Sequence, residues 1–140
     1  MKNAVPKLES SRERYFEASG GRKTATARVR LYTKGSGFIV NGKDYKEYFK
    51  NFKNQSAAFS PLELLKVEDK LRVSAKVSGG GINAQAEAVR NAIAKALVKF
   101  TADFKKRVRR SGFITRDSRA VERKKYGLKK ARRAPQWAKR

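Results

Sequence analysis

The chain has 140 residues and a formal net charge of +24, from 36 basic and 12 acidic side chains. A surface with this excess repels itself unless a polyanion neutralises it, and nucleic acid is the usual one because contacted phosphates release condensed counterions. The chain has no cysteine and no histidine, which excludes disulfides, thiolate nucleophiles, most zinc sites and the commonest general base. No stretch approaches the ~20 apolar residues of a membrane span.

Residues 1–11 contain no apolar run typical of a signal peptide, so we expect a flexible N-terminus and no secretion. Residues 25–32 alternate between apolar and polar side chains, which predicts a half-buried strand. Residues 38–40 form a short apolar run before Asn41-Gly42, a strong hairpin-turn signal. A short helix is expected around residues 45–51. The pattern Ser60-Pro61-Leu62-Glu63 predicts a further helix that begins with Ser60 as its cap.

A second alternating strand is predicted over residues 71–77, and Gly79-Gly80-Gly81 ends it. The strongest helix is predicted over residues 84–100, where alanines spaced by four form a stripe that lets a helix lie close to a sheet. This order of strands and helices indicates an α+β, two-layer domain over residues 12–104.

Residues 105–140 hold 16 basic and 2 acidic residues, so this last quarter carries more than half of the net charge. Large apolar residues are thinly spaced there, and such a segment buries too little surface to offset the entropy of ordering itself. We therefore expect an extended basic tail that orders on its partner. Its Tyr126 and Trp137 are suited either to stacking on bases or riboses, or to anchoring against a neighbouring protein or the tail's own domain.

Two glycine-containing blocks have alternative interpretations. The run at Gly79 has neither a following Lys-Ser/Thr nor Gly-x-Gly-x-x-Gly spacing, so a tight turn, with a possible RNA phosphate contact, is favoured over a cofactor loop. Its nearest downstream acid, Glu87, is interpreted as a solvent-facing charge. The block that begins at Gly21 is either a charged strand edge or a phosphate contact, and the net charge favours phosphate.

Three blocks resemble the bacterial-type small ribosomal subunit protein nine, the S-nine family. They are Gly21-Arg22-Lys23 through Ala27-Arg28-Val29; Gly79-Gly80-Gly81-x-x-Ala84-Gln85-x-x-Ala88 through Leu97; and the tail motifs Thr115-Arg116-Asp117, Glu122-Arg123-Lys124-Lys125, Lys130-Ala131-Arg132, Pro135-Gln136 and Lys139-Arg140. Two positions depart from the family pattern, with Trp137 where Phe or Tyr is common and Ala138 where Ser is common. The terminal charges are intact.

The resemblance implies the fold of the second domain of ribosomal protein S-five, with a left-handed strand–helix–strand crossover. It implies a structural protein of the small-subunit head, in the cytoplasmic ribosome, with small-subunit rRNA, neighbouring head proteins and peptidyl-site tRNA as partners. The expected tRNA contacts are Lys139 and Arg140. The expected rRNA contacts are Arg22, Lys23, Arg28, Arg30, Arg116, Arg119, Arg123, Lys124, Lys125, Lys129, Lys130, Arg132 and Arg133.

Two other classes remain open on the residues alone. A general nucleic-acid-coating protein would bind without RNA specificity. An enzyme of the same broad fold, such as a phosphotransferase, would need a nucleotide loop and acidic metal ligands, and neither is found around Gly79. We expect no catalytic residue, no metal, no cofactor, no small-molecule substrate and no membrane partner.

Overall fold

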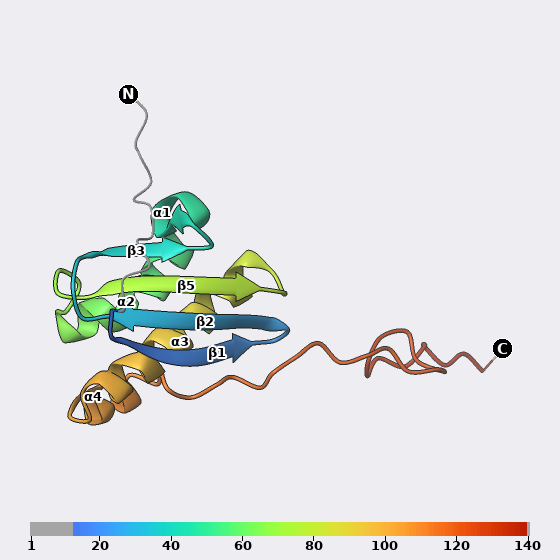
Figure 1. Ribbon diagram of the computed structural model, residues 1–140. Coiled ribbons are helices and arrows are strands. Elements are labelled where there is room, and N and C mark those ends of the chain that lie inside the picture. The colour runs from blue at the N-terminus through green and yellow to red at the C-terminus, as the bar shows by residue number, and fades with distance from the viewer. Residues whose placement is uncertain (1–12, 140) are drawn as a thin grey trace.

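The computed structural model describes residues 13–139, so the predicted N-terminal extension lies outside the described residues. Helices α2 and α3 cover one face of a five-stranded sheet with the order β1-β2-β5-β3-β4 (Figure 1). This confirms the predicted α+β two-layer fold. The strands are β1 (Tyr15–Arg22), β2 (Ala25–Tyr32), β3 (Gly37–Val40), β4 (Lys43–Asp44) and β5 (Arg72–Ser78). The helices are α1 (Tyr45–Tyr48), α2 (Phe52–Leu65), α3 (Ile82–Phe100) and α4 (Phe104–Arg110).

The sheet is mixed, because β1, β2 and β5 pair antiparallel whereas β3 and β5 pair parallel. Strands β3 and β4 form the hairpin predicted at Asn41-Gly42, and both turn residues have the positive φ that such a turn needs. The parallel pair is connected through α1 and α2, as a crossover requires. The left-handed sense of this crossover stays an expectation.

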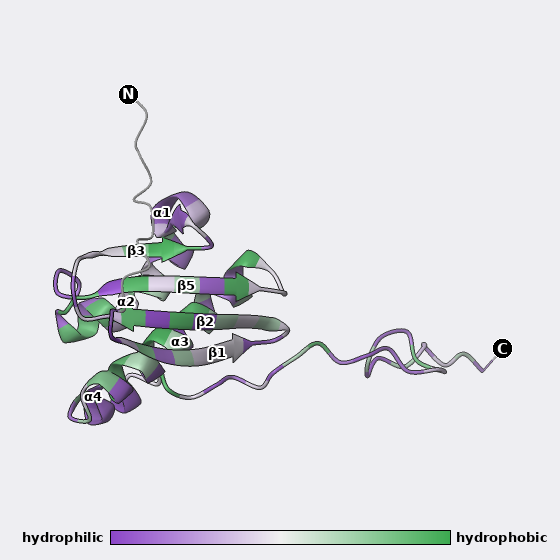
Figure 2. Ribbon diagram, in the orientation of Figure 1, coloured by the Kyte–Doolittle hydropathy of each residue, from purple (hydrophilic) through white to green (hydrophobic). Residues whose placement is uncertain are grey.

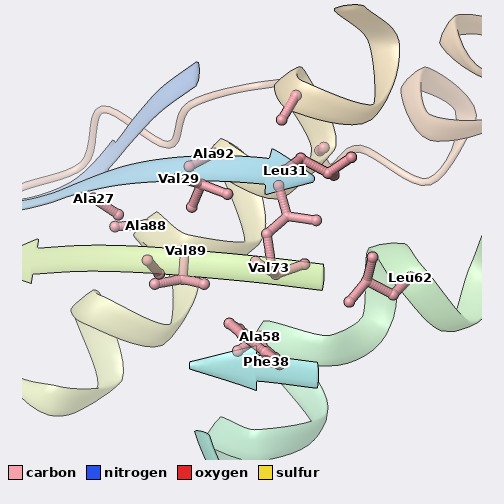
Figure 3. Close-up of a cluster of buried hydrophobic side chains, with 14 of the residues drawn as sticks. Ala27, Val29, Leu31, Phe38, Ala58, Leu62, Val73, Ala88, Val89 and Ala92 are labelled. Carbon is pink, nitrogen blue, oxygen red and sulfur yellow. The ribbon is translucent and has the colours of Figure 1, made fainter. Parts of the chain in front are cut away.

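The core lies between the sheet and the two long helices. Figure 3 shows β2, β3 and β5 facing α2 and α3 across this layer. In the colouring by hydropathy, green and purple bands alternate along β2 and β5, whereas the tail is mostly purple or pale (Figure 2). The alternations predicted for β2 and β5 are confirmed, since their apolar residues are buried and their polar residues face away from the helices. The labelled core residues in Figure 3 are Ala27, Val29, Leu31, Phe38, Ala58, Leu62, Val73, Ala88, Val89 and Ala92.

Strand β1 is absent from the sequence prediction, because glycines interrupt its alternation. One of them explains how α3 packs. A Cβ built on Gly20 would lie 2.4 Å from the Ala88 carbonyl oxygen and 2.5 Å from the Ala92 amide nitrogen. The predicted alanine stripe of α3 therefore rests directly on the β1 backbone, and only glycine leaves room for it.

The expected start of a helix at Ser60 is wrong. Helix α2 begins well before it, where the Asn51 side chain accepts a hydrogen bond from the Lys53 amide at 3.0 Å. Pro61 lies inside this helix and has no N–H to donate to the Ala57 carbonyl one turn before it. The Ser60 hydroxyl donates to that carbonyl at 2.9 Å instead. The Ser-Pro pair thus continues the helix by replacing the missing backbone donor.

The first residues of the expected extended tail are also different, because residues 104–110 form helix α4. Val108 on this helix is fully buried, and Phe113 and Ile114 pack against the core. The Asn91 side-chain amide of α3 donates to the carbonyls of Phe113 and Ile114 at 2.9 and 2.8 Å. A few apolar contacts and one buried amide thus hold residues 104–114 on the domain, despite the basic composition of this segment.

Gly20→Ala should destabilise the protein by about 2–3 kcal/mol, because the new methyl group meets backbone atoms on a packed helix that cannot turn aside. Urea unfolding of the free protein measures this. Gly81→Ala is the matched control, since a Cβ there meets nothing within 4 Å and the expected cost is only that of alanine at the N-cap of α3, about 1 kcal/mol or less. Equal unfolding midpoints for the two variants would show that α3 does not depend on this close approach.

Candidate nucleic-acid interface

The sequence-predicted basic residues lie in three places. Arg22 and Lys23 lie at the end of the β1–β2 hairpin, and Arg28 and Arg30 lie on the sheet face opposite the helices. The tail residues follow an irregular path that runs past β1 and beyond the hairpin (Figure 1). Of these, Arg116 and Arg119 contact the domain; Arg123, Lys124, Lys125, Lys129, Lys130, Arg132, Arg133 and Lys139 lie further along the tail. Arg140 lies outside the described residues.

Arg22 joins β1, α3 and the tail. Its side chain is only 13% exposed and lies 2.8 Å from the Glu87 carboxylate and 3.3 Å from the Asp117 carboxylate. It also donates to the Arg119 carbonyl at 2.7 Å. A guanidinium carries several donors in a fixed plane and can hold all three partners at once, which an ammonium cannot do in the same geometry. We call Arg22, Glu87 and Asp117 the tail anchor.

The expectation that Glu87 is simply a solvent-facing charge is therefore wrong. Its side chain is 38% exposed, and it pairs with Arg22 across 65 residues of sequence. The pairing follows from the position of α3 on β1, which the local sequence does not reveal. The predicted phosphate contact of Arg22 stays a prediction, but three protein partners already occupy most of its donors.

Asp117 is held in its ionised form. Hydrogen bonds from the Arg119 side chain and backbone amide, together with the charge of Arg22, hold the pKa of the Asp117 carboxyl well below its usual range. A depressed pKa gives a contribution that is present above the ordinary aspartate value of about 3.9 and is lost only as the pH falls below it. The same carboxylate raises the pKa of Arg119. The Asp117 carboxylate of the tail anchor is thus ionised at neutral pH.

Arg116 fixes the tail on the other side of the hairpin. Its guanidinium lies against Gly21, where a Cβ would come within 3.4 Å of it, and it donates to the Lys23 carbonyl at 3.4 Å. Because Arg116 and Asp117 both contact the hairpin, the tail leaves the domain at a defined point. The Arg119 side chain, which is 85% exposed, still presents its charge to solvent.

A second set of ion pairs and hydrogen bonds lies within the tail itself, around Glu122. Glu122 accepts from Arg132 at 2.9 Å and from Lys125 at 3.3 Å, and the Lys129 amide donates to the Arg133 carbonyl at 2.8 Å. Hydrogen bonds from Arg132 and Lys125 lower the pKa of Glu122, and the bond to Glu122 raises the pKa of Arg132. The chain folds back here into a loop over residues 122–133, which we call the tail loop.

Most tail cations remain available. Within residues 13–139, the predicted tail contacts that form no ion pair are Arg116, Arg123, Lys124, Lys129, Lys130, Arg133 and Lys139. Both tail aromatic side chains lie open to solvent, with Tyr126 96% and Trp137 82% exposed. The structure therefore does not use them as anchors on the tail's own domain. A row of free cations with interspersed exposed aromatic rings fits single-stranded or folded RNA.

No helix in residues 13–139 is both long and apolar enough to cross a membrane. The described part of the chain also contains no cluster of acidic side chains that could hold a metal ion.

Replacing Arg22 with alanine should release the start of the tail in the free protein. Loss of a largely buried, charge-assisted group is expected to raise exchange of the Arg119 amide, which donates to the Asp117 carboxylate that Arg22 holds, about tenfold. Hydrogen exchange followed by mass spectrometry measures this. Arg22→Lys should restore only part of the protection, because one ammonium cannot reach all three partners. Arg28→Ala is the control, and equal exchange in both alanine variants would contradict the anchor.

Comparisons with known proteins identify the family of the chain. The family model described as "Ribosomal protein S9/S16" matches residues 20–140. The small ribosomal subunit protein uS9c of Chlorella vulgaris is 49% identical over 127 residues, covering 87% of this chain and 90% of the relative. The uS9 proteins of Cytophaga hutchinsonii and Desulfovibrio desulfuricans are 48% and 44% identical, covering 89% and 91% of this chain and 98% of each relative.

These matches confirm the resemblance found in the three sequence blocks. They place the chain in the ribosome among structural components rather than enzymes. A mixed sheet with a close-packed helix, and a basic tail anchored at its base, are the features that the matched region contains. The chain belongs to the ribosomal protein S9/S16 family, as a structural constituent of the small subunit.

Proposed function

We propose that the chain binds small-subunit rRNA in the head of the subunit, and that its tail reaches tRNA in the peptidyl site. The observation that carries this proposal is the anchored tail. Residues 115–139 hold ten basic and two acidic residues, and they leave the domain at a fixed point beside the β1–β2 hairpin (Figure 1). Such a segment neutralises phosphates well beyond the surface of the domain.

The two carboxylates of the tail, Asp117 and Glu122, hold it in a defined conformation through ion pairs. Asp117 holds Arg119 and Arg22, and Glu122 holds Arg132 and Lys125. Neither carboxylate neutralises the run Arg123-Lys124 or the pair Lys129-Lys130, for which no ion pair is formed within the described residues. The free cations are therefore the ones that would meet RNA, and the paired ones set the path. Neighbouring head proteins are the further partners of this proposal.

Contacts of this kind fix position without reading sequence. Lysine and arginine bind phosphate oxygens, which are alike at every nucleotide, so they add affinity and a strong salt dependence. Specificity for head RNA must then come from shape, that is, from the fixed relation between the domain and the tail. The anchor supplies that relation.

Removing residues 122–140 should flatten the salt dependence of RNA binding while leaving the anchor in place. The slope of log affinity against log salt is expected to fall by roughly 0.7–0.9 for each phosphate that the shortened chain no longer binds. Filter binding to head RNA and to a generic duplex, at several salt concentrations, measures this for the full and shortened chains. A full chain that shows no preference for head RNA would overturn the proposed rRNA role.

Deletion of Lys139 and Arg140 tests the tRNA contact. We expect weaker retention of tRNA in the peptidyl site of reconstituted subunits, to a similar extent for every tRNA, because phosphate contacts carry no sequence information. The double variant Lys129→Ala, Lys130→Ala removes the same charge from the tail loop and is the control. Unchanged tRNA retention after the deletion would refute a contact by the terminal residues.

A further inference from the structure

Among the described residues, no helix covers the face of the sheet opposite α2 and α3 (Figure 1). A hollow of about 800 Å³ lies on this face, over β2 and β5 and beside the β3–β4 turn. Small or hydroxyl-bearing residues form much of its lining, including Ser19, Thr26, Ser74 and Ser78. We call this hollow the sheet-face site.

Two cations meet in the middle of the site. Arg28 on β2 and Lys76 on β5 are direct partners across the antiparallel pair, so their side chains project from the same face. Like charges in such positions destabilise a sheet. An anion bound between the Arg28 and Lys76 side chains would relieve this repulsion, which is present in the free protein.

The protein does little to neutralise this pair. Within the described residues, Lys76 forms no ion pair, and Arg28 lies 3.9 Å from Glu17. The nearer partner of Glu17 is Arg30, at 2.8 Å. No acidic side chain of residues 13–139 lines the hollow. The lining of the site therefore presents two positive charges and no negative one, and within residues 13–139 the carboxylate that pairs with either cation is that of Glu17, at 3.9 Å from Arg28.

Two hydroxyl groups lie beside the charges. Thr26 and Ser78 are hydrogen-bonded to each other across the strands, with their oxygens 3.2 Å apart, in the row next to Arg28 and Lys76. One of the two donates to the other, so the pair keeps one hydroxyl hydrogen for a ligand. Serine and threonine hydroxyls commonly join arginine and lysine in contacts with phosphate and sugar. Their small size also lets an extended backbone lie close to the sheet.

Base stacking is not available at this site, because no aromatic residue of the described chain lines it. Two rings outside the hollow already pair with cations: the Arg30 guanidinium lies 4.9 Å from the centre of the Tyr15 ring, which is still 44% exposed, and the Arg72 guanidinium lies 4.6 Å from that of Tyr32. Those pairs are cation–π contacts. The chemistry of the face is thus that of phosphate and sugar recognition.

We propose that the sheet-face site binds the sugar–phosphate backbone of folded ribosomal RNA, with Arg28 and Lys76 as its two cations and the hydrogen-bonded hydroxyl pair of Thr26 and Ser78 as a further donor. This inference rests on the proposed rRNA-binding function and extends it to a second surface, separate from the tail. It assigns a role to Lys76, Thr26 and Ser78, none of which the sequence singled out.

The test is the double variant Arg28→Ala, Lys76→Ala in the full chain, compared with Lys50→Ala, Lys53→Ala, which removes the same charge from the region of α1 and α2. Affinity for head RNA should fall at least about tenfold in the first variant, and its salt slope should drop by about 1.5. The control should stay within about twofold of the original chain. Lys76→Ala alone should leave the free protein at least as stable, since it removes a like-charge pair.

The outcomes separate this inference from the function on which it rests. If the original chain prefers head RNA but the two double variants bind alike, the sheet-face site is wrong and the proposed function stands. If the original chain does not prefer head RNA, both the proposed function and the sheet-face site are wrong. If the first variant keeps its RNA affinity but loses binding to polyglutamate, the face takes an acidic protein segment, and the RNA assignment is overturned.

Discussion

The contact between α3 and β1 is the constraint from which the other features follow. Because Gly20 has no side chain, the helix backbone at Ala88 and Ala92 lies directly on the strand. This position brings Glu87, the residue just before Ala88, to the end of β1, where it meets Arg22. It also aims Asn91 at the carbonyls of residues 113 and 114. One close approach between a helix and a strand thus sets both the route of the chain after α4 and the point where the tail departs.

The few acidic residues mainly hold segments of the chain together and neutralise only a small part of its positive charge. With 36 basic residues against 12 acidic ones, most cations cannot be neutralised within the chain. Five carboxylates of residues 13–139 form ion pairs, and three of them show how such pairs join separate segments: Glu87 joins α3 to β1, Glu17 joins β1 to β2, and Glu122 closes the tail loop. Self-repulsion is therefore left in place on the open sheet face and along the tail, where a polyanion would relieve it.

The sequence predicts those elements whose pattern is local. Strands β2 and β5 follow from strict alternation, and α3 follows from its alanine and apolar stripes. The elements that were not predicted correctly have something in common. Each of them depends on a residue distant in the sequence or on a side chain that replaces a backbone hydrogen-bond donor. Strand β1 is defined by its pairing with β2, α2 runs through Pro61 because Ser60 supplies the missing donor, and α4 is held by one buried valine. Composition alone predicts that the interface is basic. The tail anchor and the facing cations Arg28 and Lys76 could not be predicted in this way, because they depend on the register of the sheet and the position of α3.

Two sets of ion pairs, one around Asp117 and one around Glu122, lower the entropy that the tail is expected to lose on binding. A wholly unrestrained basic segment must lose the conformational freedom of every residue when it meets RNA, at roughly 1–2 kcal/mol per residue for the backbone. Arg22 and Asp117 fix the base of the tail, and Glu122 closes the loop over residues 122–133, before any partner is present. A tail that is already directed loses less freedom on binding, so more of the phosphate interaction is retained as affinity. The acidic residues lower the charge of the tail, yet they would strengthen its binding by giving it a shape in advance.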